Sequence, residues 1–244
     1  MKILLIRHGD PDYVKDSLTD KGKKEAAMLA ARLLNEKIDY AYVSPLGRAV
    51  ETARPTLEGK GMTAKYLDWL REFSDLKIVR PDYGENCPVC WDWLPADWTK
   101  YEEFFRYDEW HMQENMADAD AYEYAKEVFD GVDALLKEHG YIHDGHIFRA
   151  ENPNDDTIAL FCHFGVGCLI IGYLLGISPM PLWQGLVAAP TSVSTIVTEE
   201  RREGVASFRM SCYGDTTHLY INNELPSFAA RFCEMYKNEN ERHD

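Results

Sequence analysis

Long hydrophobic runs are missing from this sequence. No apolar segment approaches the roughly 18 to 20 residues that a membrane-spanning helix needs, and Arg7 cuts short the apolar run Ile3–Ile6 near the N-terminus. A secretory signal peptide requires a longer apolar region than this. Low-complexity tracts and internal repeats are also missing. We therefore expect a single globular domain, 1–244, without a leader or a membrane anchor.

Positive charge is scarce. The chain has 26 Lys and Arg against 41 Asp and Glu, which gives a formal net charge of -15. Nucleic acids and anionic membranes attract basic surfaces, so neither is expected as a partner. Any site for an anionic ligand must then be a local positive pocket in a negative molecule.

Clusters of the kind that hold metals are also missing. Cys87 and Cys90 form a Cys-x-x-Cys pair, but neither a second pair nor a His-x3-His motif accompanies it. His139, His143 and His146 lie close together at a spacing that fits no such motif, and we expect them on the surface. The six cysteines are scattered, which indicates reduced thiols, a cytoplasmic protein and no metal.

What the sequence does contain is two fully apolar runs that each end in a histidine and a glycine. Ile3–Ile6 leads into Arg7-His8-Gly9, and Thr157–Cys162 leads into His163-Phe164-Gly165. Continuous apolar runs of this length are typical of strands buried on both faces of a parallel sheet. Ligands bind just past the carboxyl ends of such strands, so both histidines are expected at a ligand site.

A third predicted strand, 38–43, is followed at once by a helix that carries an arginine. Ser44 can cap this helix, Pro45 can occupy its first position, and Arg48 then falls in the first turn. If the three strands are neighbours, Arg48 joins the basic residues that follow the two apolar runs. Such a cluster of fixed donors suits a phosphoryl group, because the negative charge of that group is spread over three oxygens.

The rest of the chain alternates strands and helices. We expect helices at 19–35, 119–138, 164–175 and 228–244, a strand at 62–67, a loop at 140–156, and a late hairpin at 192–198 and 205–212. The aromatic-rich, acidic stretch 75–118 is predicted to be an insertion or lid over the carboxyl edge of the sheet, with most of its aromatic side chains in its own core. The predicted fold is α/β, with a mostly parallel sheet and one antiparallel edge.

Taken in order, these motifs resemble the histidine phosphatase superfamily, also called the phosphoglycerate mutase-like family. The resemblance covers residues 1 to 73 and 157 to 213, and it implies a three-layer sandwich of helices around the sheet. It is carried by Leu5-Ile6-Arg7-His8-Gly9, Leu18-Thr19-x-x-Gly22, Ser44-Pro45-Leu46-x-Arg48-Ala49-x-x-Thr52-Ala53, Glu72 and His163-x-Gly165.

The resemblance implies a role for each of these side chains. His8 would be the nucleophile that takes the phosphoryl group, and Arg7, Arg48 and His163 would hold its oxygens. Glu72 would give a proton to the leaving alkoxide and then activate water. A small phosphorylated substrate would be hydrolysed to inorganic phosphate without metal or cofactor. Two nearby arginines would lower the pKa of His8 and keep its imidazole neutral for attack.

The acid and the substrate contacts leave more choices open. Asp68 and Asp75 lie close enough in sequence to the predicted acid to replace it. Asp10, Tyr13 and Phe164 are candidates for contacts with the rest of the substrate.

Other phosphatase classes fit less well. Asp10-x-Asp12-x-Val14 resembles the magnesium-dependent haloacid dehalogenase loop, but in that family the aspartate follows the strand directly, whereas Arg7-His8-Gly9 intervenes here. A cysteine phosphatase needs Cys-x5-Arg, and Cys168 stands where Cys162 would require that arginine. Neither a serine hydrolase elbow nor a phosphate-binding Gly-x4-Gly-Lys loop occurs.

Within the resembled family, two alternatives to a phosphatase remain. A mutase must bind a second small anion and keep water away from the phosphohistidine, so its covering insertion should be basic. The stretch 75–118 is instead rich in Asp and Glu, which favours hydrolysis. A non-catalytic phospho-ligand binder could dispense with the nucleophile or the acid, and both His8 and Glu72 are present.

Overall fold

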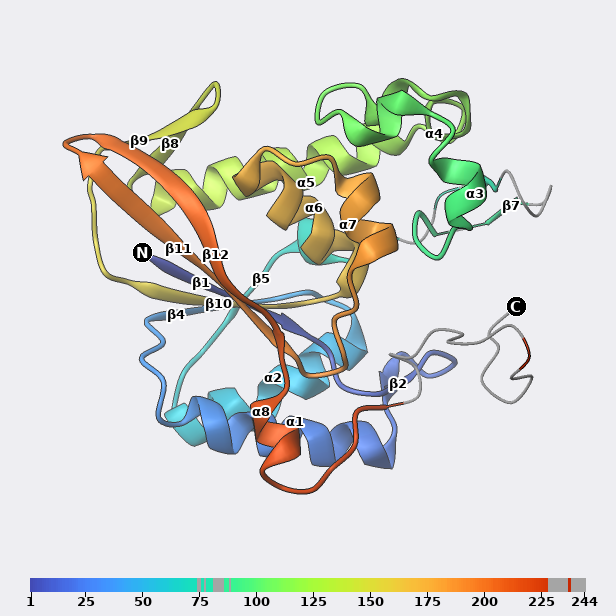
Figure 1. Cartoon of the computed structure of the whole chain (residues 1–244). Helices are drawn as coiled ribbons and strands as arrows, with labels where there is room; N and C mark the ends of the chain where they lie inside the picture. The colour runs from blue at the N-terminus through green and yellow to red at the C-terminus, as the bar shows by residue number, and fades with distance from the viewer. Residues whose placement is uncertain (74–75, 77, 81–85, 88, 228–236, 238–244) are drawn as a thin grey trace.

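The computed structural model describes residues 1–73, 76, 78–80, 86–87, 89–227 and 237. Within these residues, a large sheet runs through the middle of the molecule and helices cover both of its faces (Figure 1). No helix in the described ranges is both long and apolar enough to cross a membrane. Apart from residue 237, the predicted tail helix at 228–244 lies outside the described residues.

The main sheet confirms the predicted α/β class. Its strands lie, from edge to edge, in the order β5 (Lys65–Tyr66), β4 (Tyr40–Val43), β10 (Thr157–Cys162), β1 (Lys2–Arg7), β11 (Val193–Arg202), β12 (Val205–Asp215), β9 (Ile147–Ala150) and β8 (Tyr141–Asp144). The first four strands are parallel, and the last four continue the sheet antiparallel. The predicted late hairpin, β11 and β12, therefore begins the antiparallel edge beside β1.

The segment 140–156 is not the loop that its composition predicts. β8 and β9 form a hairpin whose turn contains Gly145 at φ 64°, and β9 pairs with β12 through Arg149 and Phe148. Each strand has four residues and includes polar side chains, so neither shows an apolar run. Pairing with the edge of β12 stabilises them, and that edge lies more than fifty residues away in the sequence.

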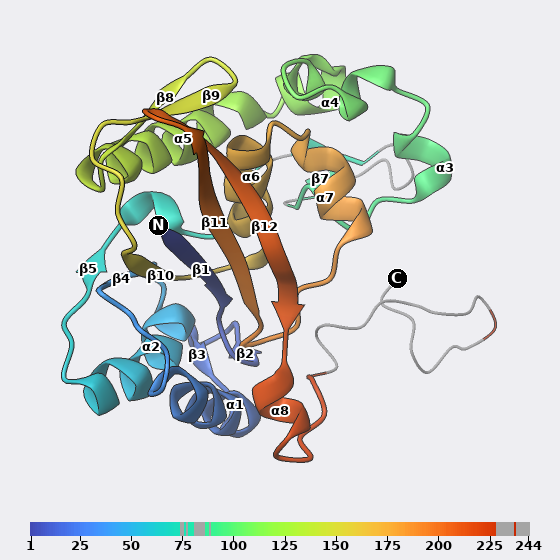
Figure 2. The same ribbon diagram turned by 60° about the vertical axis from the view of Figure 1, so that its left-hand side comes forward.

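The apolar residues of β1 alternate between two cores. Leu4 and Ile6 pack on the side of α1 (Asp20–Leu33) and α2 (Gly47–Lys60). Ile3 and Leu5 pack on the side of α5 (Ala121–Glu138), α6 (Phe164–Leu175) and α7 (Pro179–Gly185). Figure 2 shows the sheet between these two helical layers. Burial of each large apolar side chain contributes roughly 1.5–3 kcal/mol, so the carboxyl ends of β1 and β10 are firmly held.

The helix starts differ in how closely they follow the sequence. Thr19 and Asp20 are both cap candidates by sequence, and the Thr19 hydroxyl accepts a hydrogen bond from Gly22 N at 3.0 Å, so Thr19 is the cap of α1. The prediction for α2 is wrong, because this helix begins at Gly47 with Leu46 as its N-cap and without a side-chain cap. Arg48 nevertheless falls in the first turn. Only Lys65–Tyr66 of the predicted strand 62–67 is a strand.

The insertion consists of short elements. After η1 (Asp68–Leu70), which precedes the insertion, they are β6 (Ile78–Val79), β7 (Asn86–Cys87), α3 (Pro95–Trp98), η2 (Glu102–Phe105), η3 (Trp110–Met112) and α4 (Glu114–Ala117). Trp93, Trp98 and Trp110 are buried, as expected for core aromatics. Trp110 contacts Trp183 of α7 edge to face, with ring centroids 5.5 Å apart. The core of the insertion is thus continuous with that of the main domain.

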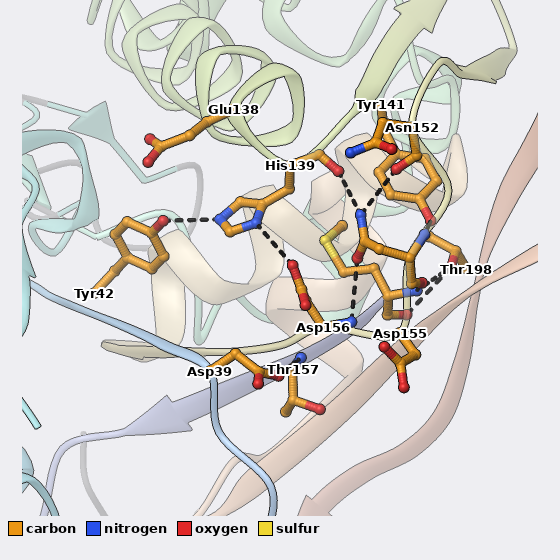
Figure 3. Close-up of polar contacts among 12 residues, drawn as sticks. Asp39, Tyr42, Glu138, His139, Tyr141, Asn152, Asp155, Asp156, Thr157 and Thr198 are labelled. Atoms are coloured by element: carbon orange, nitrogen blue, oxygen red, sulfur yellow. Dashed lines mark hydrogen bonds and ion pairs between the residues drawn. The ribbon is translucent and has the colours of Figure 1, made fainter.

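The surface position predicted for His139 is wrong. His139 is 5% exposed, and it lies at the carboxyl end of α5 between Tyr42 and Asp156 (Figure 3). Its Nε2 is 2.8 Å from the Tyr42 hydroxyl, and its Nδ1 is 3.9 Å from the Asp156 carboxylate. His143 is half-buried and bonds the Tyr173 hydroxyl. Among the three histidines, only His146 is exposed, as predicted.

Candidate active site

The carboxyl ends of β1 and β10 bring the two histidine motifs together. Arg7 pairs with Cys162 in the parallel register, so His8 and His163 leave adjacent strands at the same level. Their ring centroids are 5.0 Å apart, and each residue is 2% exposed. The sequence prediction that these side chains meet agrees with this geometry.

The hydrogen bonds of His8 fix the state of its ring. His8 Nδ1 lies 2.7 Å from the Gly9 carbonyl oxygen, which can only accept, so Nδ1 carries the proton and the Nε2 lone pair is left free. Burial lowers the pKa of His8 well below its ordinary value, and the charges of Arg7 and Arg48 lower it further. The imidazole is therefore neutral at pH 7 and able to act as a nucleophile.

Backbone contacts hold the turn after β1. Gly9 N donates to the Thr52 hydroxyl at 2.9 Å, and Thr191 N lies 3.1 Å from the carbonyl oxygens of both Arg7 and His8. A Cβ on Gly9 would lie 2.9 Å from the carbonyl oxygen of Gly22, so the turn needs glycine. Sequence reasoning did not assign a role to Thr191. Its φ of 61°, rare for threonine, is visible only in the structure.

Arg7 and Arg48 flank the two histidines from different elements. Arg7 Nη1 donates to the carbonyl oxygen of Ala188, and Arg48 Nη1 donates to Asp16 at 2.6 Å. The Nε atom of each arginine is buried and has no partner among the described residues. A buried donor without a partner is costly, and a bound anion would satisfy both of them.

His163 is oriented by a residue that the sequence suggested for another task. Ser44, which was expected to cap α2, instead places its hydroxyl 2.8 Å from His163 Nε2. Leu46 N points at the same oxygen at 3.4 Å, so the hydroxyl proton is free to bond Nε2. His163 then carries its own proton on Nδ1, which is buried and unpartnered within the described chain. Burial lowers the pKa of His163 well below its ordinary value; the neighbouring His8 ring, which competes for the proton, and the charges of Arg48 and Arg7 lower it further.

The Glu72 carboxylate lies at the N-terminus of α6, the helix that begins directly after His163. The carboxylate accepts hydrogen bonds from Gly165 N at 3.2 Å and from Val166 N at 3.1 Å, and from Phe73 N at 2.8 Å. Gly165 N and Val166 N are unpaired donors at the N-terminus of α6, a position that suits a carboxylate. Of the two alternative acids, Asp68 begins η1 and Asp75 lies outside the described residues.

The three candidate substrate contacts differ in their surroundings. The Asp10 carboxylate is bonded by the hydroxyls of Thr19, at 2.6 Å, and of Ser227, so it holds its own loop. Tyr13 is 64% exposed and its ring centroid lies 5.4 Å from the Arg48 guanidinium carbon. Phe164 lies 6.0 Å from the guanidinium carbon of Arg7, and its ring also meets the edge of Trp91 at 5.6 Å. Trp91 thereby brings the insertion against this part of the site.

Comparison with known proteins decides the family. The model of the histidine phosphatase superfamily (branch 1) matches residues 3–210. The chain belongs to this superfamily. This chain is 25% identical over 224 residues to phosphoserine phosphatase 1 of Hydrogenobacter thermophilus, and the match covers 87% of this chain and 94% of that protein. A probable phosphatase of Schizosaccharomyces pombe is 37% identical over 126 residues, which are 41% of this chain and 60% of the relative.

Solved structures show the same fold. The phosphoserine phosphatase of Entamoeba histolytica, in complex with 3-phosphoglyceric acid, has a TM-score of 0.57 at 17% identity and covers 89% of this chain and 98% of its own. A mycobacterial glucosyl-3-phosphoglycerate phosphatase has a TM-score of 0.56 at 19% identity, with 88% and 99% covered. The sequence prediction of a histidine phosphatase is confirmed, and this chain is an enzyme of a family whose named relatives are phosphatases.

The site contains several side chains that can donate hydrogen bonds to an anion, among them Arg7, Arg48 and His163. Among the described residues, no group of three or more His, Cys, Asp or Glu side chains is arranged to hold a metal ion. The groups that converge are two buried imidazoles and the guanidinium groups of Arg7, which is half-buried, and Arg48, which is buried, and these suit an anion. Ser44, which contacts His163, and Asp16, which contacts Arg48, also belong to the site. The sequence did not predict this position for either residue.

Proposed function

We propose that the chain is a metal-independent phosphomonoesterase that works through a phosphohistidine on His8. The observation that carries the proposal is the state of His8. Its Nδ1 is tied to the Gly9 carbonyl at 2.7 Å, its Nε2 has no hydrogen-bond partner in the described part of the chain, and the groups around it include Arg7, Arg48 and His163. A neutral nucleophile among fixed donors is the arrangement that phosphoryl transfer needs.

In the first step, His8 Nε2 forms a bond to phosphorus while the ester bond to the leaving oxygen breaks. Arg7, Arg48 and the Nδ1 proton of His163 bind the three equatorial oxygens. A cation close to the phosphoryl group contributes on the order of 4 kcal/mol at an effective dielectric constant near 20. Glu72, in its protonated form, donates its proton to the departing alkoxide.

In the second step, water replaces the imidazole. Glu72, now a carboxylate, takes a proton from the water as the oxygen attacks phosphorus. The bond between phosphorus and Nε2 breaks, inorganic phosphate is released, and His8 regains its neutral ring. The bonds from Gly165 N and Val166 N hold the Glu72 carboxyl group at the N-terminus of α6, which supports a role for it in both transfers.

The substrate we propose is a small phosphorylated metabolite, and phosphoserine is the first compound to test. Phosphoserine phosphatases are among the relatives in both sequence and structure. The acids of the 75–118 stretch support hydrolysis over the mutase reaction, because a mutase must hold a second anion. We also propose a cytoplasmic location, which the free thiols of Cys162, Cys168 and Cys212 support.

The test is hydrolysis of p-nitrophenyl phosphate and of phosphoserine with EDTA present. We expect full activity in EDTA, and its loss in His8→Ala. His146→Ala, which removes an exposed histidine, is the matched control and should keep wild-type rates. Activity restored only by Mg²⁺ would indicate the aspartate mechanism instead. Tight phosphate binding without turnover of any ester would indicate a non-catalytic binder.

A further inference from the structure

Asp16 joins the active-site arginine to the start of a helix. Its Oδ1 accepts a hydrogen bond from Arg48 Nη1 at 2.6 Å, and its Oδ2 accepts one from Gly47 N, also at 2.6 Å. Gly47 is the first residue of α2. The carboxylate therefore bridges the positive end of that helix and the guanidinium group, and each oxygen has a separate donor.

The backbone around Asp16 is built for this contact. Asp16 has a φ of 48°, in the left-handed region that few residues other than glycine adopt. A Cβ on Gly47 would lie 2.0 Å from the Asp16 carbonyl oxygen, so only glycine permits the loop to approach the helix this closely. Partial burial raises the pKa of Asp16, but the bonds from Gly47 N and Arg48 more than offset this and hold it below its ordinary value. Asp16 is thus an anion in a fixed place.

The contact determines which side of the guanidinium group remains available. An arginine can present two neighbouring N–H groups to two oxygens of one anion. Asp16 takes Nη1, while Nε is buried and has no partner among the described residues. The edge formed by Nε and Nη2 is then the one left for a ligand. Arg48 is 8% exposed, so this edge faces the interior, where its charge lowers the pKa of both His8 and His163.

We propose that Asp16 is a positioning residue, which holds Arg48 so that its Nε and Nη2 edge binds two oxygens of the phosphoryl group. This inference rests on the proposed function. The opposite possibility is that the carboxylate competes with phosphate for the arginine. The bond to Gly47 N argues against competition, because it keeps the carboxylate at the helix start whether or not a ligand is bound.

The two possibilities predict opposite changes in phosphate affinity when the Asp16 carboxylate is removed. Removal of a negative charge near the site should by itself favour an anion, whereas loss of a positioning contact should weaken its binding. We expect Asp16→Ala to raise both KM and the inhibition constant of inorganic phosphate by about 10-fold, since a hydrogen bond to a charged group is worth about one power of ten in affinity. The value of kcat should change much less. Asp12→Ala is the control, because Asp12 lies on the same loop and its carboxylate bonds the exposed Lys15 rather than Arg48.

A double-mutant cycle shows whether Asp16 acts through Arg48. In an Arg48→Ala background, adding Asp16→Ala should change the phosphate inhibition constant by less than about twofold. If the inhibition constant of the double variant instead rises by the product of the two single effects, the proposal is overturned. Tighter phosphate binding in Asp16→Ala alone would also overturn it. Asp16→Asn, which keeps the size of the side chain, repeats the test if Asp16→Ala does not fold, as judged by circular dichroism. If no ester is turned over at all, calorimetric titration with phosphate still tests Asp16, while the proposed hydrolase function fails separately.

Discussion

Glu25 offers a sharp test of how the loop after β1 is supported. This glutamate on α1 is 0% exposed. Its Oε2 accepts a hydrogen bond from Asp10 N at 2.8 Å, and its Oε1 has no hydrogen-bond partner among the described residues. Lys21 Nζ lies 3.8 Å from Oε1. Burial of the carboxylate raises the pKa of Glu25 from 4.5 to about 7.

The sign of the effect on stability follows from this pKa. In the unfolded chain Glu25 loses its proton near pH 4.5, whereas the folded chain keeps it until about pH 7. The folded state therefore binds more protons in this window, and the free energy of unfolding must fall as the pH rises through it. At about 1.4 kcal/mol for each pH unit, the fall amounts to about 3 kcal/mol at most.

The perturbation is Glu25→Gln, which keeps an acceptor for Asp10 N but removes the charge. We expect the difference in unfolding free energy, variant minus wild type, to increase by up to about 3 kcal/mol between pH 5 and pH 8. Urea denaturation followed by circular dichroism at several pH values measures it. Asp20→Asn is the control, because the Asp20 side chain on the same helix is 100% exposed. Wild-type and Glu25→Gln curves that stay parallel across this range would refute the reasoning.

Three further predictions concern the active site. Glu72→Gln should slow esters with poor leaving groups, such as phosphoserine, at least 100-fold more than p-nitrophenyl phosphate, since a p-nitrophenolate ion hardly needs a proton; equal losses in steady-state assays would move the acid elsewhere. Ser44→Ala should raise KM several-fold and shift the ¹⁵N signals of His163 away from the Nδ1–H tautomer, because the bond at 2.8 Å is lost; unchanged signals would contradict the role given to Ser44. Arg48→Lys should lower kcat/KM about 100-fold, since lysine cannot bind Asp16 and two phosphate oxygens together; a near wild-type kcat/KM would exclude the two-sided contact.

The sequence by itself determined the elements that rest on local patterns. The apolar runs before His8 and His163 predicted two buried parallel strands, which the structure places side by side as β1 and β10. A run without polar residues can only be satisfied by burial on both faces, so its place in the sheet follows from its composition. The order of motifs was also enough to indicate the family that the comparisons confirm.

The tertiary structure decided the contacts between residues that lie far apart in the chain. Ser44 looked like a helix cap, but it bonds His163, which lies 119 positions away. His139 looked like a surface residue, but it is buried and bonds Tyr42, which lies 97 positions away in the sequence. Nothing in the sequence around Asp16 indicates a role in the site, and its function follows only from the contact between its loop and Gly47. The local sequence around a polar side chain is compatible with several hydrogen-bond partners. The packing of the whole chain selects among them, because a buried polar atom must bond the donor or acceptor that the fold places next to it.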